Sequence, residues 1–273
     1  MPLPGPPDSL GDRMKGYEAA ETERRFLPML PVYARLDGRC FSSFTAGMDR
    51  PYDVRMSRAM IETTRALVDK AVARCGYTQS DEISLVWLAD EPTSEMFFSG
   101  KIQKMCSVLA GMAAAMFGKI AMVEWPERCA KAAPIFDCRV FQLPSRTEAA
   151  NAFLWREQDA TKNAISMAAG HYYSHKQLHK KTGPEKQEML FQAGVNFNDY
   201  PSFFKRGTFI QRRKTLRELT AEELAVIPEK YRPTGPIERG AVLDLDMPPF
   251  GKVANREAVI FDGAVPERFA KAA

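Results

Sequence analysis

The sequence predicts an α+β protein in which two helices cover one face of an antiparallel sheet. Two observations lead to this prediction. The first 145 residues show strand and helix patterns in the order β, α, β-β, α, β, and the two central strands are separated by only a tight turn. With 273 residues, 45% hydrophobic and 26% charged, the chain can bury a sizeable core.

The first half of this pattern begins with a strand over 31–36, ending at Asp37 and Gly38, where glycine permits a sharp turn and close backbone approach. Residues 52–74 lack glycine and proline and carry apolar side chains at helical spacing, so they predict a helix that Gly76 ends. The segment "YTQSDEISLVWLA" then predicts a hairpin with Asp81 at or near its turn.

The second half starts with apolar residues from Phe98 to Met116 at alternating spacings of four and three, which predict a helix ended by Gly118. A further strand is expected over 135–144. In this topology the first strand and the hairpin can be neighbours. Two aspartates, Asp37 and Asp81, would then lie at the same edge of the sheet.

The rest of the chain has a different character. Residues 151–194 are mostly helical by pattern, a basic strand or loop is expected over 203–213, and the tail is punctuated by proline and glycine. We therefore divide the chain into a disordered N-terminus, a sheet domain, a helical and basic region and a C-terminal extension, at 1–12, 13–145, 146–220 and 221–273.

Charge and cysteine content bound the environment and partners. The net charge of +4 is concentrated over 176–217, which favours a polyanionic partner, although a solvated basic face explains the pattern equally well. Five scattered cysteines predict free thiols in a reducing compartment. No apolar run is expected to reach the roughly 18–20 residues that span a bilayer, so we expect a cytoplasmic protein without membrane contact.

Two acidic residues, Asp81 and Glu82, directly precede an apolar strand, where carboxylates are costly without a positive partner. Mg²⁺ binds through one or two carboxylates together with water and phosphates, so Asp37 and Asp81 could hold it. A turn role is the commoner one for each aspartate from spacing alone. Histidines at 171, 175 and 179 follow helical spacing, which suits zinc or hydrogen bonding to phosphate.

A family resemblance adds to this interpretation. It rests on ordered blocks, and the sequence resembles the tRNA-His guanylyltransferase family, including its bacterial and archaeal guanylyltransferase-like branch, over roughly 11–213. The blocks are "RLDGRCFSSFT", "RPYD", "YTQSDEISLVW", "KIQKMCSVLAGMAAAMF", "FDCRVFQLP", "FLWREQDATKN" and "FFKRGTF". The resemblance implies a polymerase- or cyclase-like catalytic palm over 13–145 and 3′-to-5′ nucleotide addition to tRNA, with ATP and GTP as substrates. It also implies a homo-oligomer, a tetramer.

Residue roles follow from the resemblance position by position. It implies catalytic roles for Asp37, Asp81 and Glu82, with two Mg²⁺ ions held by the Asp37 and Asp81 side chains and the Gly38 carbonyl. The implied nucleotide-binding residues are Gly38, Arg39, Cys40, Phe41, Arg50, Asp53, Ser80, Lys15 and Lys104. The implied tRNA-binding residues are Arg139, Lys205 and Arg206.

One departure from the family pattern bears on which of two tRNA substrates the protein extends. Thr161 to Ala164 stand where the eukaryotic enzymes carry His-Ile-Asn-Asn, which favours template-directed repair of 5′-truncated tRNAs over addition of the extra guanosine to tRNA-His. Base pairing would then supply the nucleotide choice. The alternatives are the tRNA-His enzyme itself, an RNA-binding protein without catalysis, and a nucleotidyl cyclase that shares the palm.

Overall fold

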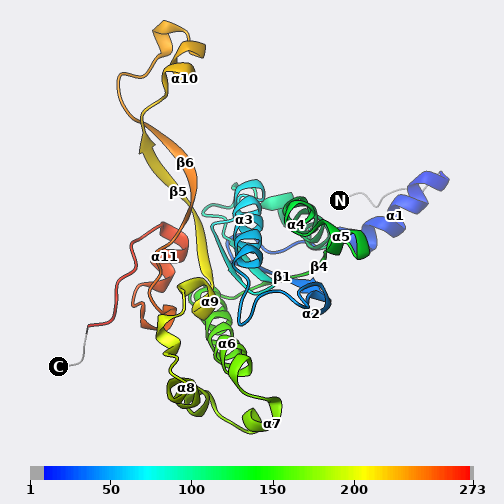
Figure 1. Cartoon of the computed structure of the whole chain (residues 1–273). Coiled ribbons are helices and arrows are strands. Elements are labelled where there is room, and N and C mark those ends of the chain that lie inside the picture. Colours follow the sequence, from blue (N-terminus) through cyan, green and yellow to red (C-terminus); the bar gives the residue numbers. More distant parts are fainter. Residues whose placement is uncertain (1–8, 271–273) are drawn as a thin grey trace.

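The computed structural model describes residues 9–270 and confirms the α+β prediction (Figure 1). One six-stranded sheet has the order β4-β1-β3-β2-β5-β6, and every pairing in it is antiparallel. The strands are β1 (Val32–Arg39), β2 (Cys75–Gln79), β3 (Glu82–Trp87), β4 (Ile135–Gln142), β5 (Thr208–Arg217) and β6 (Ile237–Asp244).

The helices lie on both faces of this sheet. The longer ones are α1 (Leu10–Thr22), α3 (Val54–Lys70), α4 (Ile102–Glu124), α6 (Arg146–Tyr172) and α8 (Gly183–Gln192). The shorter ones are α2 (Phe41–Phe44), α5 (Pro126–Lys131), α7 (His175–Leu178), α9 (Ser202–Arg206), α10 (Ala221–Val226) and α11 (Arg256–Asp262). Single 3₁₀ turns are η1 (Phe97–Gly100), η2 (Phe197–Asp199), η3 (Glu229–Tyr231) and η4 (Phe250–Lys252).

Alternation along the strands supplies two apolar layers. Leu36 and Leu85 point toward α3 and α4, and this layer confirms the predicted helix-covered face. Tyr33 and Val86 point the other way, where they pack with Phe153 of α6 and residues of α11. The second layer was not predicted, because the sequence pattern gave no orientation for α6 relative to the sheet.

Three predicted boundaries are wrong. Strand β1 continues through Asp37 and Gly38 to Arg39, and the chain turns only at Cys40, whose φ is 59°. Helix α3 ends at Lys70, and Gly76 lies inside β2, where a Cβ atom would come within 2.6 Å of the Val68 side chain. Gly76 therefore serves close helix-on-sheet packing rather than helix termination.

Helix α4 passes through Gly118 and ends at Glu124. A ridge of fully buried side chains at every fourth residue runs along its inner face and outweighs the helix cost of one glycine, about 1 kcal/mol. That ridge comprises Met105, Leu109, Ala113, Phe117 and Ala121. By length and composition α4 could cross a membrane, so the prediction that no apolar run is long enough is wrong. In the structure α4 is a sheet-covering helix.

In the C-terminal third of the chain, the helices and strands do not follow the boundaries predicted from the sequence. Phe203 to Arg206 form α9 rather than a strand, and β5 starts at Thr208. Strands β5 and β6 form a hairpin that projects from the body and carries α10 near its tip (Figure 1). The sheet thus joins the regions divided at residue 220.

Of the segment 1–12, predicted to be disordered, residues 1–8 lie outside the described residues, and α1 begins at Leu10, with Ser9 as its N-cap.

The C-terminal tail is fastened to α6 through a buried carboxylate. Glu157 is 5% exposed and accepts hydrogen bonds from the Phe250 backbone N–H at 2.8 and 3.1 Å. Phe250 is buried against Phe209, at 4.9 Å between ring centroids. Burial raises the pKa of Glu157 from 4.5 to about 7. Burial thus favours the protonated carboxyl in the folded protein, while the Phe250 N–H favours the ionised one.

We predict that Glu157→Gln flattens the pH dependence of stability. The raised pKa means that the stability contributed by protonated Glu157 is fully present below pH 4.5 and is lost as pH rises through about 7. The loss amounts to about 3 kcal/mol, at about 1.4 kcal/mol per pKa unit. Urea denaturation from pH 4.5 to 8 should show this fall in the wild type and a smaller fall in the variant. Equal slopes would contradict the prediction.

Candidate active site

The pairing of β1 with β3 brings two aspartates to one end of the sheet. Asp37 is in register with Glu82, and the Gly38 N–H donates to the Asp81 backbone carbonyl at 3.0 Å. Burial raises the pKa of the Asp81 carboxyl, and the nearby charge of Asp37 raises it further. The predicted meeting of Asp37 and Asp81 therefore occurs in the structure.

Local backbone conformation explains why these residues suit the position. Ser80 has a φ of 53°, so it takes the left-handed conformation that a tight β2–β3 turn requires. Gly38 has no room for a side chain, because a Cβ atom would lie 2.4 Å from the Phe41 ring. Since its N–H is bonded to Asp81, Gly38 offers no free amide to a phosphate.

The charge at this site is uncompensated. Within residues 9–270 neither Asp37 nor Asp81 takes part in an ion pair. In the same part of the chain, no group of three or more His, Cys, Asp or Glu side chains could hold a metal ion. Two carboxylates beside phosphates and water are nonetheless the protein ligands that Mg²⁺ commonly uses. The donor set fits a hard divalent cation.

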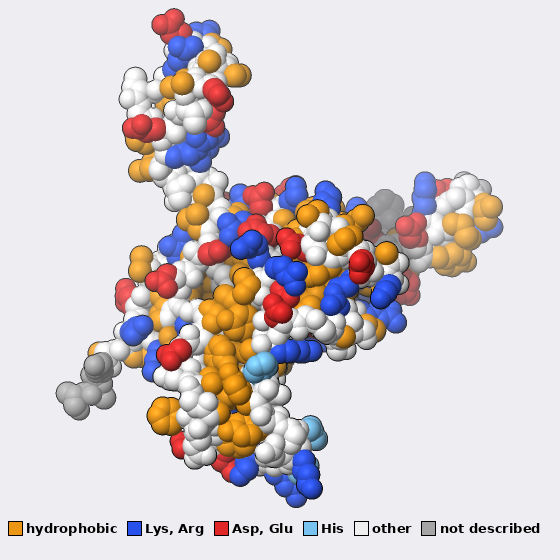
Figure 2. Space-filling view, viewed as in Figure 1, with side chains coloured by type: hydrophobic (Ala, Val, Ile, Leu, Met, Phe, Trp, Pro, Cys, Tyr) orange, Lys and Arg blue, Asp and Glu red, His pale blue; other side chains and the backbone are white. Residues whose placement is uncertain are grey.

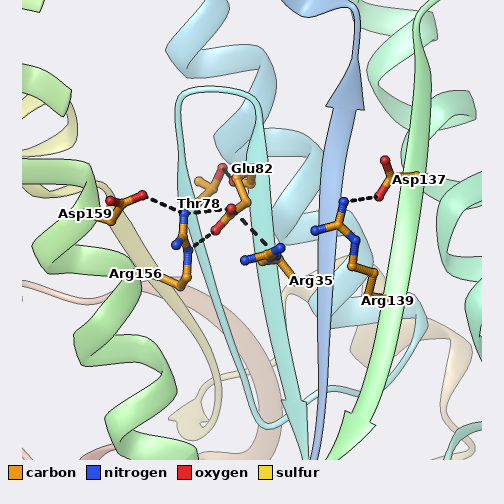
Figure 3. Close-up of polar contacts among 7 residues, drawn as sticks. All are labelled: Arg35, Thr78, Glu82, Asp137, Arg139, Arg156 and Asp159. Atoms are coloured by element: carbon orange, nitrogen blue, oxygen red, sulfur yellow. Dashed lines mark hydrogen bonds and ion pairs between the residues drawn. The ribbon is translucent and has the colours of Figure 1, made fainter.

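Glu82 has a different partner from the two aspartates (Figure 3). It accepts hydrogen bonds from Arg156 Nε at 2.5 Å and Arg156 Nη2 at 2.8 Å, and Arg35 Nε lies 3.9 Å away. Burial raises the pKa of Glu82, while Arg156 opposes that shift. Because its carboxylate is held by arginines from α6 and β1, Glu82 acts here as a residue that positions the β3 terminus.

Sequence reasoning missed this arginine system. Arg156 also donates to Asp159 at 3.1 Å, and its guanidinium lies 4.5 Å from the Trp155 ring centroid. The available signal was two charged residues and a tryptophan close together in the block "FLWREQDATKN", within a helix that must bury one face. Periodicity alone could not show which of them faces the sheet.

A cavity of about 320 Å³ opens beside Asp81. It is lined by several residues that the resemblance implies for nucleotide binding, namely Phe41, Arg50, Asp53 and Ser80. An aromatic wall was not predicted: Tyr52 packs on Phe204 with ring centroids 4.7 Å apart and on Phe203 at 5.3 Å. A larger hollow of about 950 Å³ lies beside Trp87, at the other end of β3, and includes neither aspartate. We place the site at the smaller cavity.

Comparisons with known proteins show which family this chain resembles. The sequence model of the tRNAHis guanylyltransferase family matches residues 11–144. A bacterial tRNA(His) guanylyltransferase-like protein solved in complex with ATP is 38% identical, with a TM-score of 0.70, covering 74% of this chain and 88% of that one. The chain belongs to the tRNA(His) guanylyltransferase family. The resemblance seen in the sequence is thereby confirmed.

Two further relatives extend the match. A bacterial guanylyltransferase-like protein in complex with GTP is 32% identical, with a TM-score of 0.68, and covers 90% of this chain and 95% of that one. The tRNA(His) guanylyltransferase of Saccharomyces cerevisiae is 25% identical over 210 residues, 71% of this chain and 87% of that protein. Members of this guanylyltransferase family are nucleotidyltransferases that act at the 5′ end of tRNA.

Several implied guanylyltransferase residues lie away from the cavity. Lys15 lies on α1, which projects from the body, and the Lys104 Nζ lies 5.1 Å from the Phe98 ring centroid. Arg139, on the edge strand β4, forms an exposed pair with Asp137 at 3.6 Å. The implied residues that do not line the cavity with Asp81 are Asp37, Gly38, Glu82, Lys15, Arg39, Cys40, Lys104, Arg139, Lys205 and Arg206.

Helix α9 contacts Thr161, the first residue of the segment that departs from the guanylyltransferase pattern, and it also lines the cavity. Thr161 donates from Oγ1 to the carbonyls of Glu157 at 3.0 Å and Lys205 at 3.1 Å. Lys205 donates to the Asn198 carbonyl, and Arg206 donates to Ser202 Oγ at 3.2 Å. Thr161 therefore ties α6 to α9, whose Phe203 and Phe204 line the cavity.

The three histidines do not form one helical row. His171 lies in α6, which ends at Tyr172, while His175 begins α7 and His179 follows that helix. The ring centroids of His175 and His179 are 6.3 Å apart. The break at 173–174 explains why the predicted helical alignment is wrong, and the described residues contain no zinc cluster.

We predict that Arg156→Met destabilises the fold by about 3–5 kcal/mol, because it leaves the Glu82 charge buried without its main partner. The matched control is Arg139→Met, which removes an arginine from an exposed pair and should cost about 1 kcal/mol or less. Urea denaturation at pH 7 measures both. Similar small losses in the two variants would show that the Arg156 pair does not hold the β3 terminus.

Proposed function

We propose that this protein is a Mg²⁺-dependent 3′-to-5′ nucleotidyltransferase whose role is template-directed repair of tRNAs truncated at the 5′ end. The observation that carries the proposal is that Asp81 lines a cavity and lies near Asp37, and that neither carboxylate forms an ion pair within residues 9–270. A site of this charge suits a reaction in which a cation and phosphates meet.

The Asp37 and Asp81 side chains would hold Mg²⁺, with the Gly38 carbonyl as a further ligand. When bound, Mg²⁺ stabilises negative charge on the transferring phosphoryl group and favours ionisation of an attacking hydroxyl. The protein's own contribution is a rigid mount: Asp37 lies within β1, and Asp81 is fixed by the tight turn and the Gly38 hydrogen bond. This rigidity keeps the two carboxylates at a fixed separation.

ATP and GTP are the proposed substrates, since two similar bacterial proteins were solved in complex with them. Arg50 and Ser80 line the cavity where they can bind phosphate, and Tyr52 and Phe203 offer faces for a base. In the transfer, the 3′-hydroxyl oxygen of the incoming nucleotide bonds to the activated 5′ phosphorus of tRNA. Pyrophosphate or AMP leaves, and the hydroxyl proton passes to solvent.

The choice of repair rests on the 161–164 segment. Thr161 is engaged with α9, Ala164 is buried, and Lys162 and Asn163 are exposed, so none of these side chains replaces an imidazole at this point. Template pairing can supply nucleotide choice without such a residue. A homo-tetramer is part of the proposal on the strength of the resemblance alone, and a cytoplasmic location on the strength of the five scattered cysteines.

We predict that the protein extends a tRNA lacking its first nucleotide more efficiently than tRNA-His lacking its extra guanosine. The assay supplies ATP, GTP and Mg²⁺ with each labelled RNA in a separate reaction. Asp81→Asn should abolish extension, and omission of Mg²⁺ should do the same. Asp90→Asn, which alters an exposed aspartate outside the cavity, serves as the control.

The possible results separate the candidate functions. Preferred extension of tRNA-His would assign the guanosine-adding role, despite the Thr161 to Ala164 departure. RNA binding without extension of either substrate would favour a non-catalytic RNA-binding protein. Full activity of Asp81→Asn would remove the paired aspartates from the chemistry, and a cyclic nucleotide product would indicate a cyclase.

A further inference from the structure

A trench runs from the candidate site along α6 toward α7 and α8. The cavity beside Asp81 shares Arg50, Pro51 and Met167 with a second hollow of about 320 Å³. The second hollow shares Gly170 with a third, of about 360 Å³. Because neighbouring hollows share lining residues, the three lie in a row that starts beside Asp81.

The walls of the outer two hollows favour an anionic ligand. They carry Arg50, Lys186 and three imidazoles, and they include no aspartate or glutamate. Over residues 9–270 neither Arg50 nor Lys186 belongs to an ion pair, and Lys186 donates only to Ser166 Oγ at 3.0 Å. The imidazoles are those of His171, His175 and His179.

Apolar side chains accompany this polar wall. Met167 of α6 and Tyr173, which follows that helix, line the trench, and Tyr52 and Phe203 line its inner end. Figure 2 shows a band of hydrophobic side chains running down over α9 toward α8, with histidine side chains along one side of it. Cations and hydrogen-bond donors beside aromatic faces are the combination that holds single-stranded nucleic acid.

A glycine keeps the trench open. Gly170 lies in the last turns of α6, is exposed, and a Cβ atom there would meet nothing within 4 Å. Glycine is less favourable in a helix than any residue but proline, and packing in the chain gives no reason for it here. Gly170 lies where the second and third hollows meet, and this position gives a reason for the glycine, because a large side chain there would project into the trench.

We propose that this trench binds the sugar-phosphate backbone of the RNA strand whose end reacts beside Asp81. The inference rests on the proposed function, which places an RNA 5′ end at that site. Lys186 and the histidines contact RNA phosphates, Met167 and Tyr173 contact sugar or base surfaces, and Arg50 remains with the incoming nucleotide at the inner end of the trench. From Met167 to Tyr172, the last residue of α6, the helix rises about 8 Å, so the trench is long enough to contact more than one nucleotide.

The first test compares Gly170→Leu with Gly111→Leu. Gly111 is also an exposed glycine in a long helix, with nothing within 4 Å of its Cβ position, but it lies on α4, away from the trench. The probe is a fluorescent tRNA lacking its first nucleotide, titrated by anisotropy without nucleotides. Gly170→Leu should weaken binding at least about fivefold, the loss expected for one phosphate contact at 0.1 M salt. Gly111→Leu should not weaken binding.

Thermal unfolding of the same variants removes misfolding as an explanation. Leucine is a better helix former than glycine, so the unfolding midpoint of Gly170→Leu should be unchanged or higher. Weaker RNA binding by a protein of equal or greater stability would support an obstructed trench. Unchanged RNA affinity in Gly170→Leu would overturn the proposal.

A second pair of variants tests the phosphate contacts. Lys186→Gln should lower the slope of log affinity against log salt by about 0.7, the value for one contact with a single strand. Lys119→Gln, an exposed lysine of α4, is the matched control and should leave the slope unchanged. An unchanged slope in Lys186→Gln would also overturn the proposal. So would a loss of GTP affinity with RNA affinity intact, because it would assign the trench to a mononucleotide.

These results can be told apart from failure of the proposed function. If the wild type adds nucleotides and Gly170→Leu binds RNA normally, the trench proposal fails and the proposed function stands. If RNA binding depends on Gly170 and Lys186 but the protein adds no nucleotide, the proposed catalytic function fails and the trench remains an RNA-binding site.

Discussion

The structure depends on holding two like charges together at the end of a buried sheet. Asp37 and Asp81 come close because β1 pairs with β3, with Asp37 in register with Glu82, and the Gly38 N–H donates to the Asp81 carbonyl at 3.0 Å. Burial raises the pKa of the Asp81 carboxyl, and repulsion from the nearby Asp37 charge raises it further. A bound cation, together with phosphates, would offset this unfavourable charge arrangement.

Helix α6 organises the surroundings of this charge. Arg156 neutralises Glu82, the acidic neighbour of Asp81, while Glu157 fastens the C-terminal tail and Thr161 ties down α9. Farther along, the exposed side of the helix, with Gly170, forms the trench. One helix therefore supports the sheet terminus, the aromatic wall and the surface that leads away from the site.

The fold could be predicted in outline because its strands and helices have distinct periods and the hairpin has a clear turn. The ends of elements could not, since tertiary packing decided them: Gly118 is tolerated inside α4 by a buried ridge, and Gly76 is required by contact with Val68. The two aspartates could be placed from topology. The partner of Glu82 could not, because Arg156 is 74 residues away and only the packing of α6 brings them together.

The most direct test of the paired-aspartate site is a Mn²⁺ titration followed by electron paramagnetic resonance in the presence of GTP, with Mn²⁺ standing in for Mg²⁺. The wild type should bind Mn²⁺, and Asp37→Asn and Asp81→Asn should each weaken binding by at least about tenfold. Glu82→Gln should retain it, because arginines hold that carboxylate. Equal binding by both aspartate variants, or loss in Glu82→Gln alone, would contradict this assignment of the site.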